Sequence, residues 1–231
     1  MHRILLADDD TELCEMLTEY LTHEGFAVDV ASDGTMALSK ALAHEYDLVI
    51  LDVMMPQQSG FDVLRQLRKT RATPVLMLTA RAEDVDNIVG LELGADDYLT
   101  KPTNPRVLVA HMRSVLRRTR TQALETEVPT AEILRLDDLE IHTGSRSVIC
   151  VGQPLEMTST EYSVLEVLVR EAGHVVTKSE LSERALGRKL SPFDRSLDMH
   201  VSNLRRKLGS TPDNGERIKT VRGVGYQYVT S

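Results

Sequence analysis

The sequence predicts an α/β fold in its first half, a five-stranded doubly wound parallel sheet, followed by a second domain. Within residues 1–118, short apolar runs of strand length alternate five times with segments of helical spacing, as in a parallel sheet with crossover helices. The 231 residues exceed one average domain, and residues 119–132 show little apolar periodicity and contain one proline. We therefore predict a first domain at 1–118, a linker at 119–132 and a second domain at 133–231.

Five apolar runs predict the strands, and the residues between them predict the helices. The runs lie at 4–7, 28–30, 48–51, 74–78 and 98–99, and their continuous hydrophobicity is typical of strands buried on both faces. Apolar residues three or four positions apart predict helices at 13–21, 37–42, 61–67, 88–94 and 105–118. Gly25 and Gly94 supply stop signals, and Pro105 suits the first turn of the last helix.

Composition excludes several classes of protein. Hydrophobic residues make up 42% and charged residues 27% of the chain, which is ordinary for a globular protein and unlike a disordered or collagen-like chain. No apolar run approaches the ~18 residues that cross a bilayer, and three acids follow the first apolar run, so we expect no signal peptide and no membrane partner. Cys14 and Cys150 form no CxxC pair, so we expect no disulfide framework, no zinc site and a cytoplasmic location.

Polar side chains follow four of the predicted strands at the same end. They are Asp8 and Asp9 after the first strand, Asp52 after the third, Thr79 at the end of the fourth and Lys101 after the fifth. Because ligands of such sheets bind beyond the carboxyl ends of the strands, we expect these groups to meet. Clustered carboxylates need a neutralising cation, and oxygen donors suit Mg²⁺. The alternatives are structural: Asp8 and Asp10 as helix caps, and Lys101-Pro102 as an ordinary loop.

The charge of the chain is divided unevenly. The formal net charge of −8 by itself argues against a nucleic-acid partner. Residues 1–119 carry 12 basic and 19 acidic side chains, net −7, whereas residues 184–222 carry ten basic and four acidic ones, net +6. The second domain therefore concentrates positive charge in one segment, which is typical of nucleic-acid binding.

The second domain resembles a winged helix-turn-helix in the order of its elements. Residues 134–157 contain short alternating strands, and Thr158 to Glu161 form a capping-box signature at the start of a helix. Two more helices are predicted at 177–186 and 195–208, followed by a hairpin around Gly223-Val224-Gly225. At 1.5 Å per residue the 195–208 helix is about 21 Å long, which fits a major groove.

The helix at 195–208 has one apolar side and one polar side. The apolar residues recur at spacings of four, three and four: Leu197, Val201, Leu204 and Leu208. The polar side and the hairpin supply the predicted DNA contacts. We expect Asn203 and Ser202 to contact bases, His200, Arg205 and Thr220 to contact phosphates, and Arg222 to enter the minor groove. Arg206, on the same polar side, is also predicted to contact DNA. The alternative is that this basic side is simply solvated surface.

With these residues, the chain resembles the response regulators of the OmpR/PhoB type over nearly its whole length. The matching residues are Asp8-Asp9, Asp52 with Met54-Met55-Pro56, Gly60, Thr79-Ala80, the run 94–98 (GADDY), Lys101-Pro102 and the runs 191–195 (SPFDR) and 204–208 (LRRKL). The resemblance implies a receiver domain of the flavodoxin-like (CheY-like) fold in a transcription regulator that is not an enzyme. It also implies that a sensor histidine kinase phosphorylates Asp52, and that the protein then dimerises, binds promoter DNA and engages RNA polymerase.

The resemblance also assigns roles within the first domain. The metal ligands would be Asp9, Asp52 and the backbone carbonyl of Met54, with Asp8 acting through water. Stabilisation of the phosphoryl group would come from Thr79 and Lys101, switching from Tyr98, and a cis peptide would join Lys101 and Pro102.

The dimer face departs from the family pattern. The resemblance implies cross-subunit ion pairs on a face that here includes Asp96, Asp97, His111 and Arg118. The departures are Asn87, Val107 and His111, where the family commonly has a basic residue, an acid and an arginine, and Thr103, where it commonly has phenylalanine. We expect a weaker or differently paired dimer, in which Asp97 meets His111 at low pH.

Two other functions stay open on the sequence. An aspartyl-phosphate phosphohydrolase on a similar sheet would be an enzyme, but such enzymes carry an acid two residues after the nucleophile, where this chain has Met54. A DNA-binding scaffold that ignores phosphate would keep its DNA affinity after the substitution Asp52→Asn.

Overall fold

The computed structural model describes residues 1–79, 90–91, 93–120, 132–190, 194–211 and 215–230, with the backbone alone at 118–120. The chain divides into two compact units, Met1–Leu116 and Arg117–Ser231. Among the described residues, no helix is long and apolar enough to cross a membrane.

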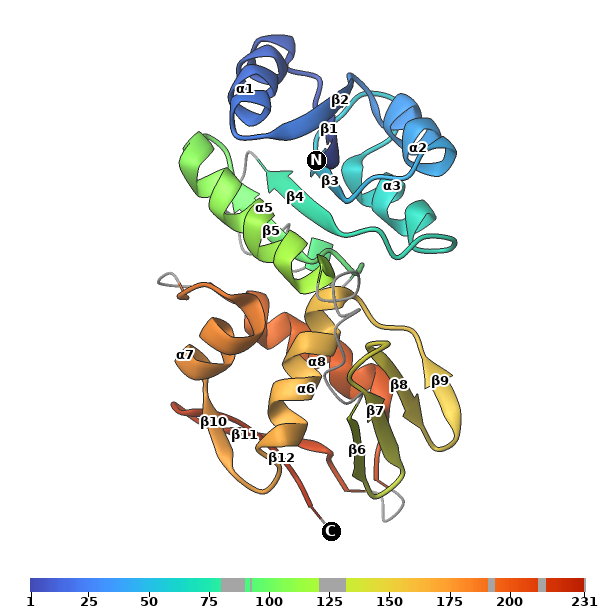
Figure 1. Ribbon diagram of the computed structural model, residues 1–231, viewed down its shortest axis with the longest axis vertical. Coiled ribbons are helices and arrows are strands. Elements are labelled where there is room, and N and C mark those ends of the chain that lie inside the picture. The colour runs from blue at the N-terminus through green and yellow to red at the C-terminus, as the bar shows by residue number, and fades with distance from the viewer. Residues whose placement is uncertain (80–89, 92, 121–131, 191–193, 212–214, 231) are drawn as a thin grey trace. The chain divides into compact units, whose positions relative to one another are not determined.

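The first unit is built on a sheet of five strands: β1 (His2–Ala7), β2 (Phe26–Ala31), β3 (Leu48–Asp52), β4 (Val75–Thr79) and β5 (Asp97–Thr100). Their order is β2-β1-β3-β4-β5, and every neighbouring pair is parallel. β3 and β4 are buried along their whole length because helices cover both faces of the sheet (Figure 1). The predicted doubly wound α/β fold is confirmed.

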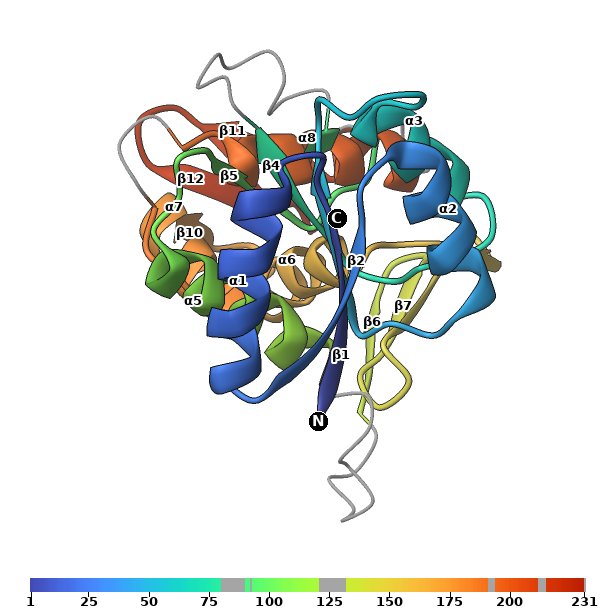
Figure 2. The ribbon, with the colours of Figure 1, turned by 90° about the horizontal axis from the view of Figure 1, so that it is seen from above.

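The described helices of the first unit are α1 (Thr11–His23), α2 (Gly34–Ala43), α3 (Gly60–Leu67) and α5 (Pro105–Arg120). α1 and α5 lie on one face of the sheet, and α2 and α3 lie on the other (Figures 1 and 2). α1, α2 and α3 each begin after an Asp or Ser whose side chain accepts a backbone hydrogen bond from the first turn. Of the helix predicted at 88–94, residues 90 and 91 are helical, and residues 88, 89 and 92 lie outside the described residues. α5 begins at Pro105 as predicted and continues two residues beyond the predicted domain end at 118.

The second unit opens with an antiparallel sheet of four strands: β6 (Ile133–Leu136), β7 (Leu139–His142), β8 (Ser147–Cys150) and β9 (Gln153–Leu155). α6 (Ser159–Arg170) follows, and Thr158 and Glu161 form the predicted capping box at its start. α7 (Lys178–Leu181) continues into a π-helical turn, η1 (Ser182–Leu186), and the third helix is α8 (Ser196–Leu208).

A C-terminal hairpin, here called the wing, completes the second unit. It consists of β11 (Ile218–Val221) and β12 (Gly225–Tyr228). The strand β10 (Val175–Thr177) pairs with β12; it was not predicted, because three residues are too short for an alternating pattern. Residues of α6, η1, α8 and the wing share one hydrophobic core, which confirms the winged helix-turn-helix.

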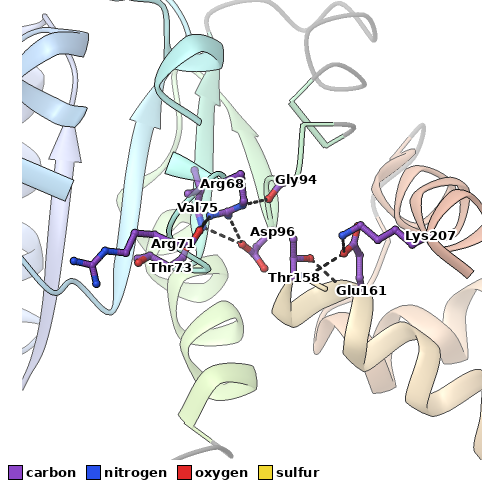
Figure 3. Close-up of polar contacts among 9 residues, drawn as sticks. All are labelled: Arg68, Arg71, Thr73, Val75, Gly94, Asp96, Thr158, Glu161 and Lys207. Carbon is purple, nitrogen blue, oxygen red and sulfur yellow. Dashed lines mark hydrogen bonds and ion pairs between the residues drawn. The ribbon is translucent and has the colours of Figure 1, made fainter. Parts of the chain in front are cut away.

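Two ion pairs with a buried member connect parts of the second unit. Arg217, whose side chain is 3% exposed, donates to both oxygens of the Asp138 carboxylate at 2.5 and 2.7 Å. This pair ties the turn between β6 and β7 to the residue before the wing. On α8, Lys207 donates to the buried Glu161 of α6 at 2.6 Å, and Glu161 also accepts from the backbone N–H of Thr158 (Figure 3).

Candidate functional site

The carboxyl edge of the first sheet brings the predicted polar side chains together. Asp8 follows β1, Asp52 ends β3, Thr79 ends β4 and Lys101 follows β5. Asp8, Asp52 and Thr79 are each no more than 2% exposed. The convergence follows from the topology, because β1, β3, β4 and β5 are consecutive parallel neighbours in the sheet.

Lys101 joins two of the carboxylates at this edge. Its ammonium nitrogen lies 2.5 Å from Asp8 Oδ2 and 2.7 Å from Asp52 Oδ1. Burial raises the pKa of Asp52, and the hydrogen bond from Lys101 opposes that rise. Burial lowers the pKa of Lys101, but its hydrogen bonds to Asp52 and Asp8 outweigh burial and leave that pKa raised. The Lys101 ammonium therefore stays charged at neutral pH. The peptide bond between Lys101 and Pro102 is cis, as predicted.

Three carboxylates at the same edge are close enough to share a cation. Asp8, Asp9 and Asp52 each offer an oxygen, and these oxygens lie within 4.8 Å of one another. Asp8 and Asp52 are buried whereas Asp9 is exposed, so the group is open to solvent on one side. Hard oxygen donors of this kind fit Mg²⁺. Because Lys101 supplies only one positive charge for three carboxylates, a divalent cation would neutralise the remaining negative charge.

Backbone contacts fix the position of Asp52. The Met54 N–H donates to Asp52 Oδ2 at 2.8 Å, and the Met54 side chain is 65% exposed. At the start of α3, a Cβ atom on Gly60 would lie 2.1 Å from the Asp52 carbonyl oxygen, so this close approach requires glycine. The Asp52 carboxylate is therefore held in place beside an exposed rim. The role of the Met54 carbonyl as a metal ligand stays a prediction.

Thr79 and Tyr98 lie on the neighbouring strands β4 and β5. Thr79 is opposite Thr100 in register and Tyr98 is opposite Met77, so Tyr98 lies two residues further from the edge. Tyr98 is half-buried. The roles of Thr79 as a phosphate donor and of Tyr98 as the switch stay predictions. Asp10 is a helix cap, which was the structural alternative for this residue: its side chain accepts a backbone hydrogen bond at 3.0 Å at the start of α1.

The exposed side of α8 differs from the prediction. Ser202 and Arg206 are exposed and Arg205 is half-buried. His200 and Asn203 are 1% and 2% exposed. The structure buries His200 and Asn203, which we had predicted on the exposed side, and their roles as DNA contacts stay predictions.

Helix geometry explains this difference. With about 3.6 residues per turn, His200 lies about 60° around the helix from Leu197 and so borders the apolar side. Asn203 lies one turn before Lys207, whose ammonium reaches α6, and the Asn203 amide oxygen accepts from Arg206 at 3.0 Å. An apolar pattern marks the centre of a buried helix side, but the neighbouring elements decide how far burial extends around it.

The wing supplies the remaining predicted contacts. Arg205 donates to a carbonyl of β11 at 2.9 Å and to the Thr220 hydroxyl at 2.7 Å, so it fastens α8 to the wing. Arg222 is exposed in the turn between β11 and β12. The exposed members of the predicted set are therefore Ser202, Arg206, Thr220 and Arg222, and these four define the candidate DNA face.

Comparisons with known proteins agree with both halves of this description. The family description "Response regulator receiver domain" matches residues 4–113, and "Transcriptional regulatory protein, C terminal" matches residues 152–228. The transcriptional regulatory protein CpxR of Klebsiella pneumoniae is 48% identical over 235 residues, covering 100% of both chains. The chain belongs to the OmpR/PhoB family of response regulators.

Two solved structures are similar along the whole chain. A mutant of RitR covers 100% of both chains with a TM-score of 0.77 and 27% identity. The response regulator DrrB, an OmpR/PhoB homologue of Thermotoga maritima, covers 99% of both chains with a TM-score of 0.53 and 31% identity. The runs at 191–195 and 204–208 likewise resemble those of CpxR. The protein is thus a transcriptional regulator with a receiver domain and a DNA-binding domain.

The acids expected on the dimer face of the receiver are bound within the chain. Asp97 Oδ2 lies 2.8 Å from His111 Nδ1, and the Asp97 side chain is buried. Asp96 accepts from Arg68 at 3.2 Å and from a backbone N–H of β4 at 3.0 Å (Figure 3). The structure therefore places the Asp97–His111 contact inside one subunit, where we had expected it between two. The side chain of Arg118 lies outside the described residues.

Arg68 was not predicted, although it orders the approach to β5. Following α3, its guanidinium donates to the carbonyls of Gly94 and Thr73 at 2.9 and 2.7 Å and to Asp96 (Figure 3). These bonds connect the residues before β4 with the residues before β5. The sequence carried no signal for this role, because Arg68 stands among several basic residues of similar spacing: Arg65, Lys69 and Arg71.

Proposed function

We propose that this response regulator is switched by transfer of a phosphoryl group from a sensor histidine kinase to Asp52. One observation carries the proposal: the Asp52 carboxylate lies at the carboxyl edge of the sheet, 2.7 Å from the Lys101 ammonium and within 4.8 Å of oxygens of Asp8 and Asp9. A carboxylate is a weak nucleophile, so attack on phosphorus depends on positioning and charge neutralisation. Lys101 supplies positive charge beside the attacking oxygen.

The same edge is proposed to hold a magnesium ion. Its ligands are Asp9, Asp52 and the backbone carbonyl of Met54, with Asp8 acting through water. When bound, Mg²⁺ offsets negative charge on the phosphoryl oxygens. The Thr79 hydroxyl is proposed to donate a hydrogen bond to the phosphoryl group, since Thr79 ends the strand beside Asp52 and its carbonyl accepts from the Lys101 N–H at 2.7 Å.

Phosphorylation is proposed to change the face of the receiver that β5 and α5 form. A phosphoryl group adds roughly −1.5 to −2 charges, and Thr79 moving toward it would leave space for Tyr98 to fill. Two copies then pair on this face, which includes Asp96, Asp97, His111 and Arg118. Because Asp97 and Asp96 already have partners within the chain, cross-subunit ion pairs must compete with them, and we expect a weak dimer.

The second unit is proposed to bind promoter DNA in the cytoplasm and to engage RNA polymerase. α8 enters the major groove with Ser202 toward the base edges and Arg206 toward the phosphates. Arg222, exposed in the turn of the wing, enters the minor groove. Arg205 donates a hydrogen bond to the Thr220 hydroxyl. These two residues are proposed to support this arrangement and to lie near the phosphate backbone of the DNA. Two copies would occupy half-sites ~10–10.5 bp apart.

Intact-mass measurement tests the acceptor residue. The protein is incubated with a small acyl phosphate and Mg²⁺, and wild type is compared with Asp52→Ala and with Asp62→Ala, an exposed aspartate on α3. We expect one added phosphoryl group in wild type and Asp62→Ala, and none in Asp52→Ala or after chelation of Mg²⁺. An added group in Asp52→Ala contradicts the proposal. Rapid release of phosphate with no retained group would instead favour a phosphohydrolase.

A further inference from the structure

A cluster of side chains outside the phospho-acceptor edge joins α8 to the wing. Asp198 lies in the first turn of α8, and its Oδ1 atom lies 2.6 Å from the Lys178 ammonium and accepts the Tyr226 hydroxyl. Tyr226 belongs to β12 and is 4% exposed. Lys178 is the first residue of α7. Side chains of three separate elements therefore meet at one carboxylate oxygen.

Lys178 also holds the turn of the wing. Its backbone N–H donates to the Val224 carbonyl at 3.1 Å, two residues after Arg222. Its ammonium lies 5.8 Å from the centre of the Tyr226 ring, within the range of a cation–π contact. Lys178 thus fixes the turn that carries Arg222 through its backbone, and fixes α8 through its side chain.

A second anchor lies on the same side of α8, about two turns further along. Arg205 donates to a carbonyl of β11 and to Thr220, and its guanidinium carbon lies 5.9 Å from the Tyr226 ring centre. Seven residues separate Asp198 from Arg205, which is about 10.5 Å along a helix. Two anchors at this separation fix the rotation of α8 about its own axis, and the rotation decides which side chains face outward.

The charge of Asp198 argues against a role in general DNA affinity. It is an acid within residues 184–222, a segment of net charge +6, and a negative charge there opposes phosphate binding. The side chains of Asp198 and Lys178 are 37% and 43% exposed, and an ion pair so exposed contributes little to folding stability. What Asp198 does supply is a fixed geometry between α8 and the wing.

We infer that Asp198 is a positioning residue for sequence-specific DNA reading. Through Tyr226 and Lys178 it holds α8 in one orientation, so that Ser202 in the major groove and Arg222 in the minor groove fit the same site at once. The inference rests on the proposed DNA face. A helix free to rotate on the wing would keep its phosphate contacts but would lose the match to one sequence.

The test measures two affinities of the full-length protein. One duplex is selected by wild type from a random-sequence pool, and the other is a scrambled duplex of the same length and composition. We expect the ratio of the two affinities to fall about tenfold in Asp198→Asn and about threefold in Tyr226→Phe, which keeps the charge. Affinity for the scrambled duplex rises in Asp198→Asn, because one negative charge near the phosphates is lost, and stays unchanged in Tyr226→Phe.

Glu183→Gln is the matched charge control, because it removes one negative charge from an exposed side chain of η1; its ratio is expected to equal that of wild type. A wild-type ratio in both test variants overturns the inference, as does an equal loss of affinity for both duplexes. If Asp198→Asn does not fold, as judged by thermal unfolding, Tyr226→Phe decides by the same criteria. Failure of wild type to select any duplex would instead contradict the proposed DNA face.

Discussion

The two units use buried charge in different places. In the receiver, the buried carboxylates Asp8 and Asp52 meet Lys101 at the functional edge of the sheet. In the DNA-binding unit, the ion pair between the buried Arg217 and the partly buried Asp138 joins a turn of the sheet to the wing, while the candidate DNA contacts are exposed. The difference fits the proposed ligands: a phosphoryl group accompanied by Mg²⁺ would enter the acidic edge of the receiver, whereas DNA would be bound at exposed side chains. Removing a buried charge should therefore impair chemistry in one unit and folding in the other.

The largest expected effect is on folding of the DNA-binding unit. Arg217→Ala leaves the partly buried Asp138 carboxylate without its guanidinium partner, and we expect the free energy of unfolding of this unit to fall by about 3 kcal/mol. Circular dichroism in a denaturant series measures the loss. The control is Arg135→Ala on β6, whose side chain is 67% exposed and lies 3.5 Å from Glu140; it should cost less than about 1 kcal/mol. Equal losses of unfolding free energy in Arg217→Ala and Arg135→Ala would contradict the expected difference between a buried and an exposed ion pair.

The same ion pair predicts a pH dependence. Hydrogen bonds from Arg217 lower the pKa of Asp138 below its ordinary value. A carboxyl whose pKa is lowered by folding adds stability at pH values above its unfolded pKa of ~3.9, and this stability is lost as the pH falls through the folded pKa. We therefore expect the stability difference between wild type and Asp138→Asn to be constant from about pH 6 to 8 and to shrink below about pH 4. A constant difference down to the acid transition would contradict this.

In the receiver, the corresponding change should slow chemistry. Lys101→Met removes the ammonium beside Asp52, and we expect phosphoryl transfer from a small acyl phosphate to slow about 100-fold, the usual effect of losing one charge-stabilising group. The rate of mass gain measures this effect. Lys69→Met, which removes an exposed ammonium after α3, should keep the wild-type rate. A wild-type rate in Lys101→Met would show that the ammonium has no part in the transfer.

On the DNA face, exposed and buried residues of α8 should behave differently. Arg206→Ala should weaken binding to all duplexes by about three- to tenfold and reduce the salt slope by about one, because one phosphate contact is lost. Asn203→Ala should leave the base preference unchanged, since this side chain is buried. Selection from a random-sequence pool and titration at several salt concentrations measure both effects. A changed base preference in Asn203→Ala would show that Asn203 reads bases although it is buried in this structure.

The smallest expected effect concerns the dimer face. His111→Ala removes a partner that Asp97 has within its own subunit, so the dissociation constant of the phosphorylated dimer should change by less than about threefold. Sedimentation of the phosphorylated protein measures the constant. A rise of tenfold or more in the dissociation constant of the dimer would instead place the Asp97–His111 contact between subunits.

The contrast between the two units also explains what the sequence could predict. The positions of Asp8, Asp52 and Lys101 could be predicted because parallel strand order alone decides where residues after each strand lie. The burial of His200 and Asn203 could not, because it depends on which neighbours pack beside α8.

Ion pairs distant in sequence left no signal at all. Arg217 and Asp138 are 79 residues apart, and no local pattern in a single sequence links them. The capping box of Thr158 and Glu161 was predictable for the opposite reason, since its two hydrogen bonds span three residues.

DNA affinity in the two phosphorylation states tests the central claim most directly. Binding of the selected duplex is measured with and without a small acyl phosphate and Mg²⁺, for wild type and for Asp52→Ala. We expect wild type to bind about tenfold more tightly after treatment, through pairing of receivers on adjacent half-sites, and Asp52→Ala to bind equally in both conditions. Equal affinity of wild type in both conditions, or tightening in Asp52→Ala, would contradict the central claim.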